Sequence, residues 1–331
     1  MSTAPVPESG FSPSQTLAGT PDEVAWVVRV PPRPKFQHNY RRHLLLFVLT
    51  LFTTTYREAV LYPLDVVLAW WQTGVWHNAL AAFAWPYLVD GLWFSLPLLT
   101  ILSAHEFGHY VFCRIHDVDA TLPYYLPAPI SLTGTFGAVI RIREPFPSKA
   151  ALFDIGVAGP IAGFVALLPF LVWGIRHSQM APVQADAIWL GEPLLWKALA
   201  RLQFGVLPPG LDIYMHPVGM AAWIGMLMTA LNLLPFGQLD GGHIMYAALG
   251  RWAHWCSGIT LGIVVVLAVQ TPSWYVTAGL MVVMAVLFGF RHPRIYDEHV
   301  PLDRRRRWLA LLALLIFVLC FMPVPISMTH P

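Results

Sequence analysis

The chain has 331 residues, of which 56% are hydrophobic and only 11% are charged, and its mean hydropathy is +0.58. A water-soluble domain usually carries about a quarter charged residues. The composition therefore excludes an ordinary soluble globular protein and indicates an integral membrane protein. The formal net charge of +2 gives no reason to expect a nucleic-acid partner.

The N-terminal stretch is rich in proline and low in hydrophobicity, a composition typical of disordered segments. Its sequence has no apolar run typical of a cleavable signal peptide. We therefore expect a disordered tail over residues 1–42 and a transmembrane domain over 43–290. A basic linker and a last transmembrane helix are expected over 291–331.

Several apolar segments approach or meet the roughly 20 residues that a membrane helix needs. They lie at 43–62, 91–113, 150–175, 217–236, 255–271, 273–290 and 308–327. The stretch 78–88 is too short to cross, and we interpret it as a segment at the membrane interface. The expected fold class is an all-α polytopic membrane protein with about six to seven transmembrane helices.

Lys and Arg gather before the first predicted span, in the connection 114–149, and in the run Arg304–Arg307. A seven-span arrangement puts these groups on one side, and the basic residues of segment 176–214 are the exception. The positive-inside rule then predicts a cytoplasmic N-terminus. The bacterial inner membrane is the predicted location, and an organelle or archaeal membrane is the alternative. We interpret Arg304–Arg307 as a topology anchor, and an anionic-lipid site is the alternative.

The predicted span 91–113 carries the sequence His105-Glu106-Phe107-Gly108-His109. Positions i and i+4 of a helix share a face, so both histidines can bind one metal ion while Glu106 polarises a water. Ionisable residues are costly inside a membrane and usually mark functional sites. Polar contacts between helices are the alternative interpretation.

Catalytic zinc usually has three protein ligands and one open position. The predicted span 217–236 is followed by Asp240, at the depth where the seven-span arrangement places His105 and His109. We therefore expect Asp240 to be the third ligand of one zinc ion per chain. His243 lies nearby, but we do not assign it as a ligand.

The sequences HEFGH and NLLPFGQLDGGH, in two separate spans, resemble the site-2 protease family of intramembrane metalloproteases. The resemblance covers about residues 91–250, the core of the expected domain. It implies zinc binding by His105, His109 and Asp240, with Glu106 as the general base. The spacing between His109 and Asp240 leaves no room for a PDZ-type insertion, so the chain resembles a compact member of this family.

The same resemblance implies that Asn232 holds the substrate strand or the oxyanion. An interhelical hydrogen bond is the alternative role for this residue. The run Gly134–Arg141 is bracketed by glycine and rich in strand-forming residues, which predicts a small β-hairpin near the active site. In the resembled family a similar segment pairs with an extended substrate, and an ordinary hairpin is the alternative.

Small residues recur at helical spacing in the predicted span 150–175 and indicate a surface for close helix packing. They are Gly156, Gly159, Ala162 and Gly163.

The resulting hypothesis is a zinc-dependent intramembrane endopeptidase that cleaves transmembrane segments of membrane-anchored proteins with metal-activated water. Its expected partners are single-span membrane protein substrates and the lipid bilayer. One alternative is a membrane transporter or metal carrier that uses the same His and Asp ligands. Another is a catalytically silent family member that binds membrane proteins.

Overall fold

The computed structural model describes residues 34–57, 79–183, 189–289 and 300–327, together with residues 295 and 297. Lys35–Pro331 form one compact unit, and that unit is mostly helical. Most of the predicted tail, residues 1–33, lies outside the described residues, as do residues 58–78 of the predicted first span and the connection after it.

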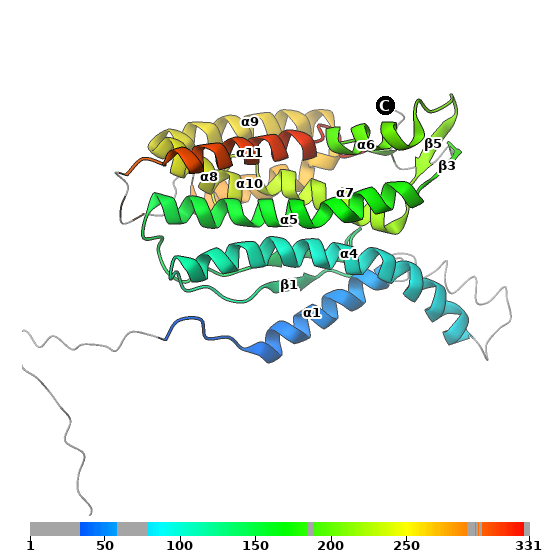
Figure 1. The fold of residues 1–331 in the computed structure, drawn as a ribbon, viewed down its shortest axis with the longest axis horizontal. Helices are drawn as coiled ribbons and strands as arrows, with labels where there is room; N and C mark the ends of the chain where they lie inside the picture. Colours follow the sequence, from blue (N-terminus) through cyan, green and yellow to red (C-terminus); the bar gives the residue numbers. More distant parts are fainter. Residues whose placement is uncertain are drawn as a thin grey trace, which may run out of the picture. The chain divides into compact units, whose positions relative to one another are not determined.

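Three apolar helices pack on one another at the centre of this unit (Figure 1). They are α4 (Ala79–Ile115), α5 (Lys149–His177) and α7 (Pro217–Asn232). The side chain of Ser148 accepts a hydrogen bond from the Ala151 N–H and so caps the start of α5. Pro217 opens α7, where its missing N–H costs nothing.

Helix α1 (Tyr40–Thr55) and a β-hairpin cover the α4 side of this core. The hairpin pairs β1 (Tyr124–Pro127) antiparallel with β2 (Thr135–Val139). Helix α1 meets α4 and the hairpin through hydroxyl groups. Thr55 Oγ1 lies 2.8 Å from Ser95 Oγ, and Thr53 Oγ1 donates to the Gly134 carbonyl at 2.7 Å. Such small polar contacts favour close helix packing inside a membrane.

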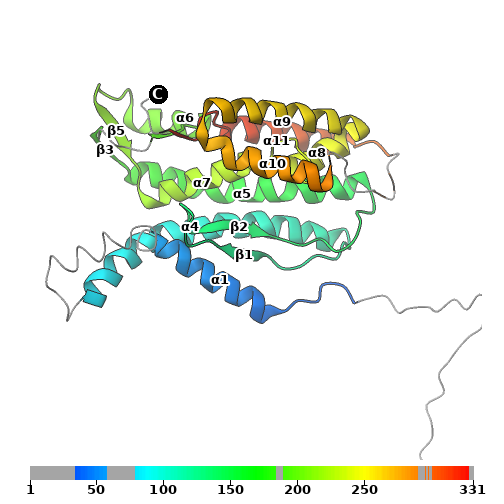
Figure 2. The ribbon, with the colours of Figure 1, turned by 180° about the vertical axis from the view of Figure 1, so that it is seen from behind.

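The remaining helices lie beyond α5 and α7, on the other side from α4 (Figure 2). They are α6 (Leu194–Phe204), α8 (Asp240–Leu249), α9 (Ala253–Gln270), α10 (Tyr275–Phe288) and α11 (Arg304–Cys320). Short 3₁₀ turns, Gly250–Trp252 and Pro272–Trp274, join α8 to α9 and α9 to α10. Two further strand pairs join β3 (Gln179–Pro182) to β5 (Leu211–Tyr214) and β4 (Trp189–Leu190) to β6 (Ile326–Ser327).

Each predicted span overlaps a helix, and the predicted hairpin is present. Among the described residues, two helical segments are long and apolar enough to cross a membrane, Lys149–His177 and Asp240–Gln270. Pro217–Asn232 and Pro272–Leu287 are apolar but shorter. The mostly helical fold with small strands is confirmed, whereas the count of six to seven spans stays a prediction.

Two boundaries differ from the sequence-based expectations. The predicted interfacial segment at 78–88 is wrong as a separate element, because helix α4 already begins at Ala79 and continues without a break to Ile115. Helix α1 begins at Tyr40, inside the stretch predicted as tail, because the Asn39 side chain accepts from the Arg42 N–H and caps it there.

Candidate metal centre

His105 and His109 project from the same face of α4, and both are buried. Their Nε2 atoms lie 3.1 Å apart, as the i, i+4 spacing predicts. Glu106, between them in sequence, is also buried. Helix α4 thus brings two imidazoles and a carboxylate into an apolar interior. Burying such groups costs free energy, and where they occur they usually mark a functional site.

Asp240 reaches the two histidines because the chain turns sharply after α7. Gly237 has φ +50°, and Asp240 is the first residue of the next helix, α8. A Cβ at Gly241 or Gly242 would overlap backbone carbonyl groups of the turn, so only glycine lets α8 start this close. Asp240 Oδ2 then lies 3.2 Å from His105 Nε2 and 3.3 Å from His109 Nε2.

These three side chains fit a zinc ion. One ligand atom from each lies within 4.8 Å of the others, and the contacts given above are 3.1–3.3 Å. Ligands at about 2.0–2.2 Å from a tetrahedral zinc stand roughly 3.3 Å from one another. Two imidazoles, one carboxylate and room for a fourth ligand are a typical donor set for catalytic zinc.

A backbone carbonyl orients His109. Its Nδ1 lies 2.7 Å from the Ile155 carbonyl oxygen of α5. A carbonyl can only accept, so we infer that Nδ1 carries a proton and that Nε2 is the nitrogen facing Asp240 and His105. Nε2 is therefore the ring atom placed to bind a metal ion, and such outer hydrogen bonds from the other nitrogen are typical of metal-binding histidines.

The small residues of α5 form the wall against which the histidines lie. A Cβ at Gly159 would overlap the His109 ring, and a Cβ at Gly163 would lie 3.1 Å from His105 Cβ. On the facing helix, a Cβ at Gly108 would lie 2.6 Å from the Ala158 carbonyl oxygen. The predicted packing surface is confirmed, and it lies directly against the predicted ligands.

Glu106 points to the hairpin. Its Oε2 accepts a hydrogen bond of 2.9 Å from the Ile140 N–H, the first residue after β2. The hairpin is further tied to α4 by a 2.6 Å hydrogen bond between Tyr125 OH and Ser103 Oγ. The backbone of the hairpin therefore fixes the Glu106 carboxylate beside the candidate metal ligands.

The structure places Asn232 at the edge of the centre, and it leaves His243, which was not assigned as a ligand, outside the group of three. Asn232, the last residue of α7, has its Nδ2 3.4 Å from His105 Nε2. His243 lies against Gly156 and near the Phe146 ring, and among the described residues it is not part of the metal-binding group. The backbone groups of Ile155 and Ile140 were not predicted, since any residue type supplies them.

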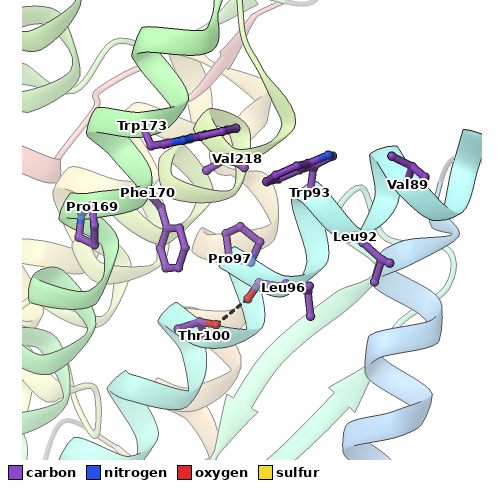
Figure 3. A pocket seen from close by; sticks show the side chains of 10 residues that line it. All are labelled: Val89, Leu92, Trp93, Leu96, Pro97, Thr100, Pro169, Phe170, Trp173 and Val218. Carbon is purple, nitrogen blue, oxygen red and sulfur yellow. Dashed lines mark hydrogen bonds between the residues drawn. The ribbon is translucent and has the colours of Figure 1, made fainter.

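The far end of the α4–α5 contact differs from the metal end. There, large side chains replace the small ones and leave an apolar cavity of about 630 Å³ (Figure 3). The indole rings of Trp93 and Trp173 both line it and stack on each other with centroids 5.2 Å apart. Pro97 and Pro169, one from each helix, also line it.

The model of the family described as peptidase family M50 matches residues 93–267, more than half of the chain. The chain belongs to peptidase family M50. The match includes His105, Glu106, His109 and Asp240, and it confirms the resemblance to the site-2 proteases. No solved structure matches the chain.

Relatives within the M50 proteins are named as metalloproteases. The probable zinc metalloprotease EGY2, chloroplastic, of Arabidopsis thaliana is 33% identical over 167 residues, which is 50% of this chain and 30% of the relative. The probable zinc metalloprotease EGY1, chloroplastic, of the same plant is 26% identical over 306 residues, 88% of this chain and 55% of the relative. The chain thus spans from about a third to about half of the length of these proteins.

These M50 relatives agree with the predicted enzyme class, a metalloendopeptidase, and with zinc as the predicted cofactor. Their names place the plant proteins in chloroplasts. They therefore give no support to the predicted bacterial inner membrane or to the predicted orientation of the N-terminus.

Proposed function

We propose that this protein is a zinc-dependent intramembrane endopeptidase that cleaves transmembrane segments of membrane-anchored proteins. The observation that supports it most is the convergence of His105, His109 and Asp240, with ligand atoms within 4.8 Å, beside the buried carboxylate of Glu106. Membership of peptidase family M50 and the apolar helices agree with the proposal.

In this proposal His105, His109 and Asp240 hold one zinc ion. When bound, zinc activates a water molecule and polarises the scissile carbonyl. The Ile155 carbonyl keeps the proton on His109 Nδ1, so that Nε2 is free to act as a ligand. The Asp240 carboxylate balances part of the ion's charge in a region that excludes water.

Glu106 is the proposed general base. It takes the proton of the attacking water and passes it to the leaving amine. A general base must lie within hydrogen-bond reach of the water that it activates. The Ile140 N–H holds the carboxylate in place. Asn232, whose Nδ2 lies 3.4 Å from His105 Nε2, is close enough to the centre to hold the oxyanion or the substrate strand.

The substrates in this proposal are single-span membrane proteins within the lipid bilayer. A helix hides its peptide carbonyls, so the segment must unwind before attack. An unwound segment can add as a strand to a sheet edge, and the hairpin of β1 and β2 lies beside Glu106. A transmembrane domain that ends near residue 290, with its core at 91–250, and a cytoplasmic N-terminus are further parts of the proposal.

The variant Glu106→Gln tests this function, with co-expression of a panel of tagged single-span membrane proteins. The amide is similar in size to the carboxylate but cannot accept the water's proton. We expect the variant to keep wild-type zinc content and to lose cleavage by at least about a hundredfold, the lower end of the contribution of general-base catalysis.

Two outcomes contradict the proposal. If the variant cleaves as fast as wild type, Glu106 is not the base. If wild type yields no fragment from any substrate yet moves zinc across a membrane, the carrier alternative is correct. His109→Ala is the control, because it removes a ligand and is expected to lose both zinc and cleavage.

A further inference from the structure

A single carboxylate joins three helical elements near the start of α5. Arg306 of α11 donates to Asp154 through two nitrogens, Nε to Oδ1 at 2.8 Å and Nη2 to Oδ2 at 2.6 Å. His116, directly after α4, places its Nε2 3.0 Å from the same Oδ2. A two-point guanidinium–carboxylate pair fixes both distance and orientation, unlike a single ionic contact. Asp154 therefore ties α11 and the end of α4 to α5.

Arg306 is distinct within the basic run Arg304–Arg307. Asp303 caps α11 by accepting from the Arg306 N–H at 2.8 Å, and its carboxylate also bonds the Arg306 side chain, which holds the guanidinium in place. In the part of the chain that the structure describes, no other side chain of this run bonds to another helix. A role in membrane orientation explains the charge of the run but not this one pairing.

Asp154 is the neighbour of the residue that orients a candidate zinc ligand. Ile155, next in sequence, gives its carbonyl to His109 Nδ1 at 2.7 Å. Both residues lie near the start of α5, so a rotation or shift of α5 that breaks the Asp154 contacts also moves the Ile155 carbonyl. The Arg306–Asp154 pair and the His109 ring are therefore mechanically connected through two adjacent residues.

The α4–α5 contact is close at the metal end, where the facing surfaces are small, with Gly108 against Ala158 and Gly159 against His109. At the far end the two helices line the apolar cavity in Figure 3. Small residues permit close approach of two helices, and a polar pair inside a protein can specify their register.

We propose that Arg306 is a positioning residue for the metal centre. Through Asp154 it holds α5 where the Ile155 carbonyl orients His109 for zinc. The inference rests on the proposed function, since it assumes that His109 is a zinc ligand. It assigns to α11, which lies outside the family match at 93–267, a part in metal binding.

The test compares the zinc affinity of full-length variants, purified in a bilayer mimic and titrated with zinc against a chromophoric chelator. Arg306→Gln is expected to bind zinc about tenfold more weakly, since loss of groups that orient metal ligands typically costs 10–100-fold. Arg306→Lys keeps the charge but not the two-point geometry. Its zinc affinity should lie between those of wild type and Arg306→Gln, about threefold weaker than wild type. Arg305→Gln removes the same charge from the same run and should bind as wild type does.

Thermal unfolding is measured on the same samples. If Arg306→Gln lowers the unfolding midpoint but leaves zinc affinity unchanged, Arg306 only supports the fold and the inference is wrong. Equal weakening by Arg305→Gln and Arg306→Gln also overturns it, because the effect is then one of general charge. Should Arg306→Gln not fold, Arg306→Lys decides, and wild-type affinity in that variant overturns the inference.

His109→Ala separates failure of this inference from failure of the proposed function. If His109→Ala binds zinc like wild type, the ligand assignment and the inference fall together. If it loses zinc while both Arg306 variants keep wild-type affinity, the proposed function stands and the inference alone fails.

Discussion

Gly159 and Gly163 determine how closely α5 approaches the imidazoles of His109 and His105. Any side chain at Gly159 would occupy the space of the His109 ring, whereas a Cβ at Gly163 would be in tight contact with His105. A glycine inside a helix costs about 1 kcal/mol relative to alanine. Its presence here is explained by the space that the His109 ring requires.

We predict that Gly159→Ala displaces the His109 ring and weakens zinc binding by at least about tenfold, as expected when a ligand loses its orientation. Metal analysis after dialysis against a weak chelator measures the effect. Gly258→Ala is the matched control, because Gly258 lies in α9 with nothing within 4 Å of an added Cβ. Retention of wild-type zinc by Gly159→Ala would contradict the placement of His109.

For single residues, the sequence predicts which side chains meet at the candidate metal centre. His105, Glu106 and His109 follow from one motif on a helix, and Asp240 follows from its depth after a later span. The carbonyl of Ile155 and the N–H of Ile140 could not be predicted in this way. Their contribution comes from backbone groups that every residue carries, and only the packing of α5 and the hairpin against α4 brings them to the site.

The β1–β2 hairpin holds the carboxylate of Glu106, the proposed general base, through a backbone hydrogen bond. Its second strand, β2, ends at Val139, and the following N–H of Ile140 donates to Glu106 Oε2 at 2.9 Å. Hydrogen bonds to charged groups contribute about 1.5–3 kcal/mol. The position of the Glu106 carboxylate thus depends on the hairpin staying in register with α4.

We predict that Ile140→Pro reduces cleavage by about ten- to a hundredfold while zinc content stays unchanged, because proline removes the N–H that Glu106 accepts from. Proline is tolerable there since the preceding Val139 is already extended. Ile140→Ala keeps the N–H and is expected to cleave within about threefold of wild type. Equal losses in both variants would show that the side chain of Ile140, not its N–H, is what matters.

Helices and strands were predicted correctly where one sequence feature was clear, and were missed or misplaced where features in the same stretch pointed to different structures. The run Gly134–Arg141 contains β2, but its partner Tyr124–Pro127 lies among prolines, which usually argue against a strand. Helix α7 ends at Asn232, earlier than the apolar run to residue 236 suggested, because Pro235 and Gly237 do not continue a helix. Helix α6 has too few residues to cross a membrane and was not predicted.

The molecule as a whole brings together parts that are far apart in sequence. His105 and His109 come from α4, Asp240 from α8, and the α5 wall against which they lie comes from between. The apolar segments predicted the order of the helices, since each must be buried or face lipid. They did not predict α4 as one long helix from Ala79, because the break in hydrophobicity near 90 does not break the backbone hydrogen bonds.

A metal ion held between α4 and α8 should stabilise the whole unit and not the site alone, because it bonds to the folded arrangement and to no comparable arrangement in the unfolded chain. Free zinc at about 100 times its dissociation constant adds roughly 2.7 kcal/mol to the free energy of unfolding.

We predict that stripping zinc with a chelator lowers the thermal unfolding midpoint of wild type and abolishes cleavage, and that added zinc restores both. Asp240→Ala supplies the control, since without the α8 ligand the chelator has no link between the helices to remove and the midpoint should not move. An unchanged midpoint in wild type, with metal analysis showing the ion gone, would mean that the three ligands are held together by packing of α4, α5 and α8 and that zinc contributes only to the chemistry.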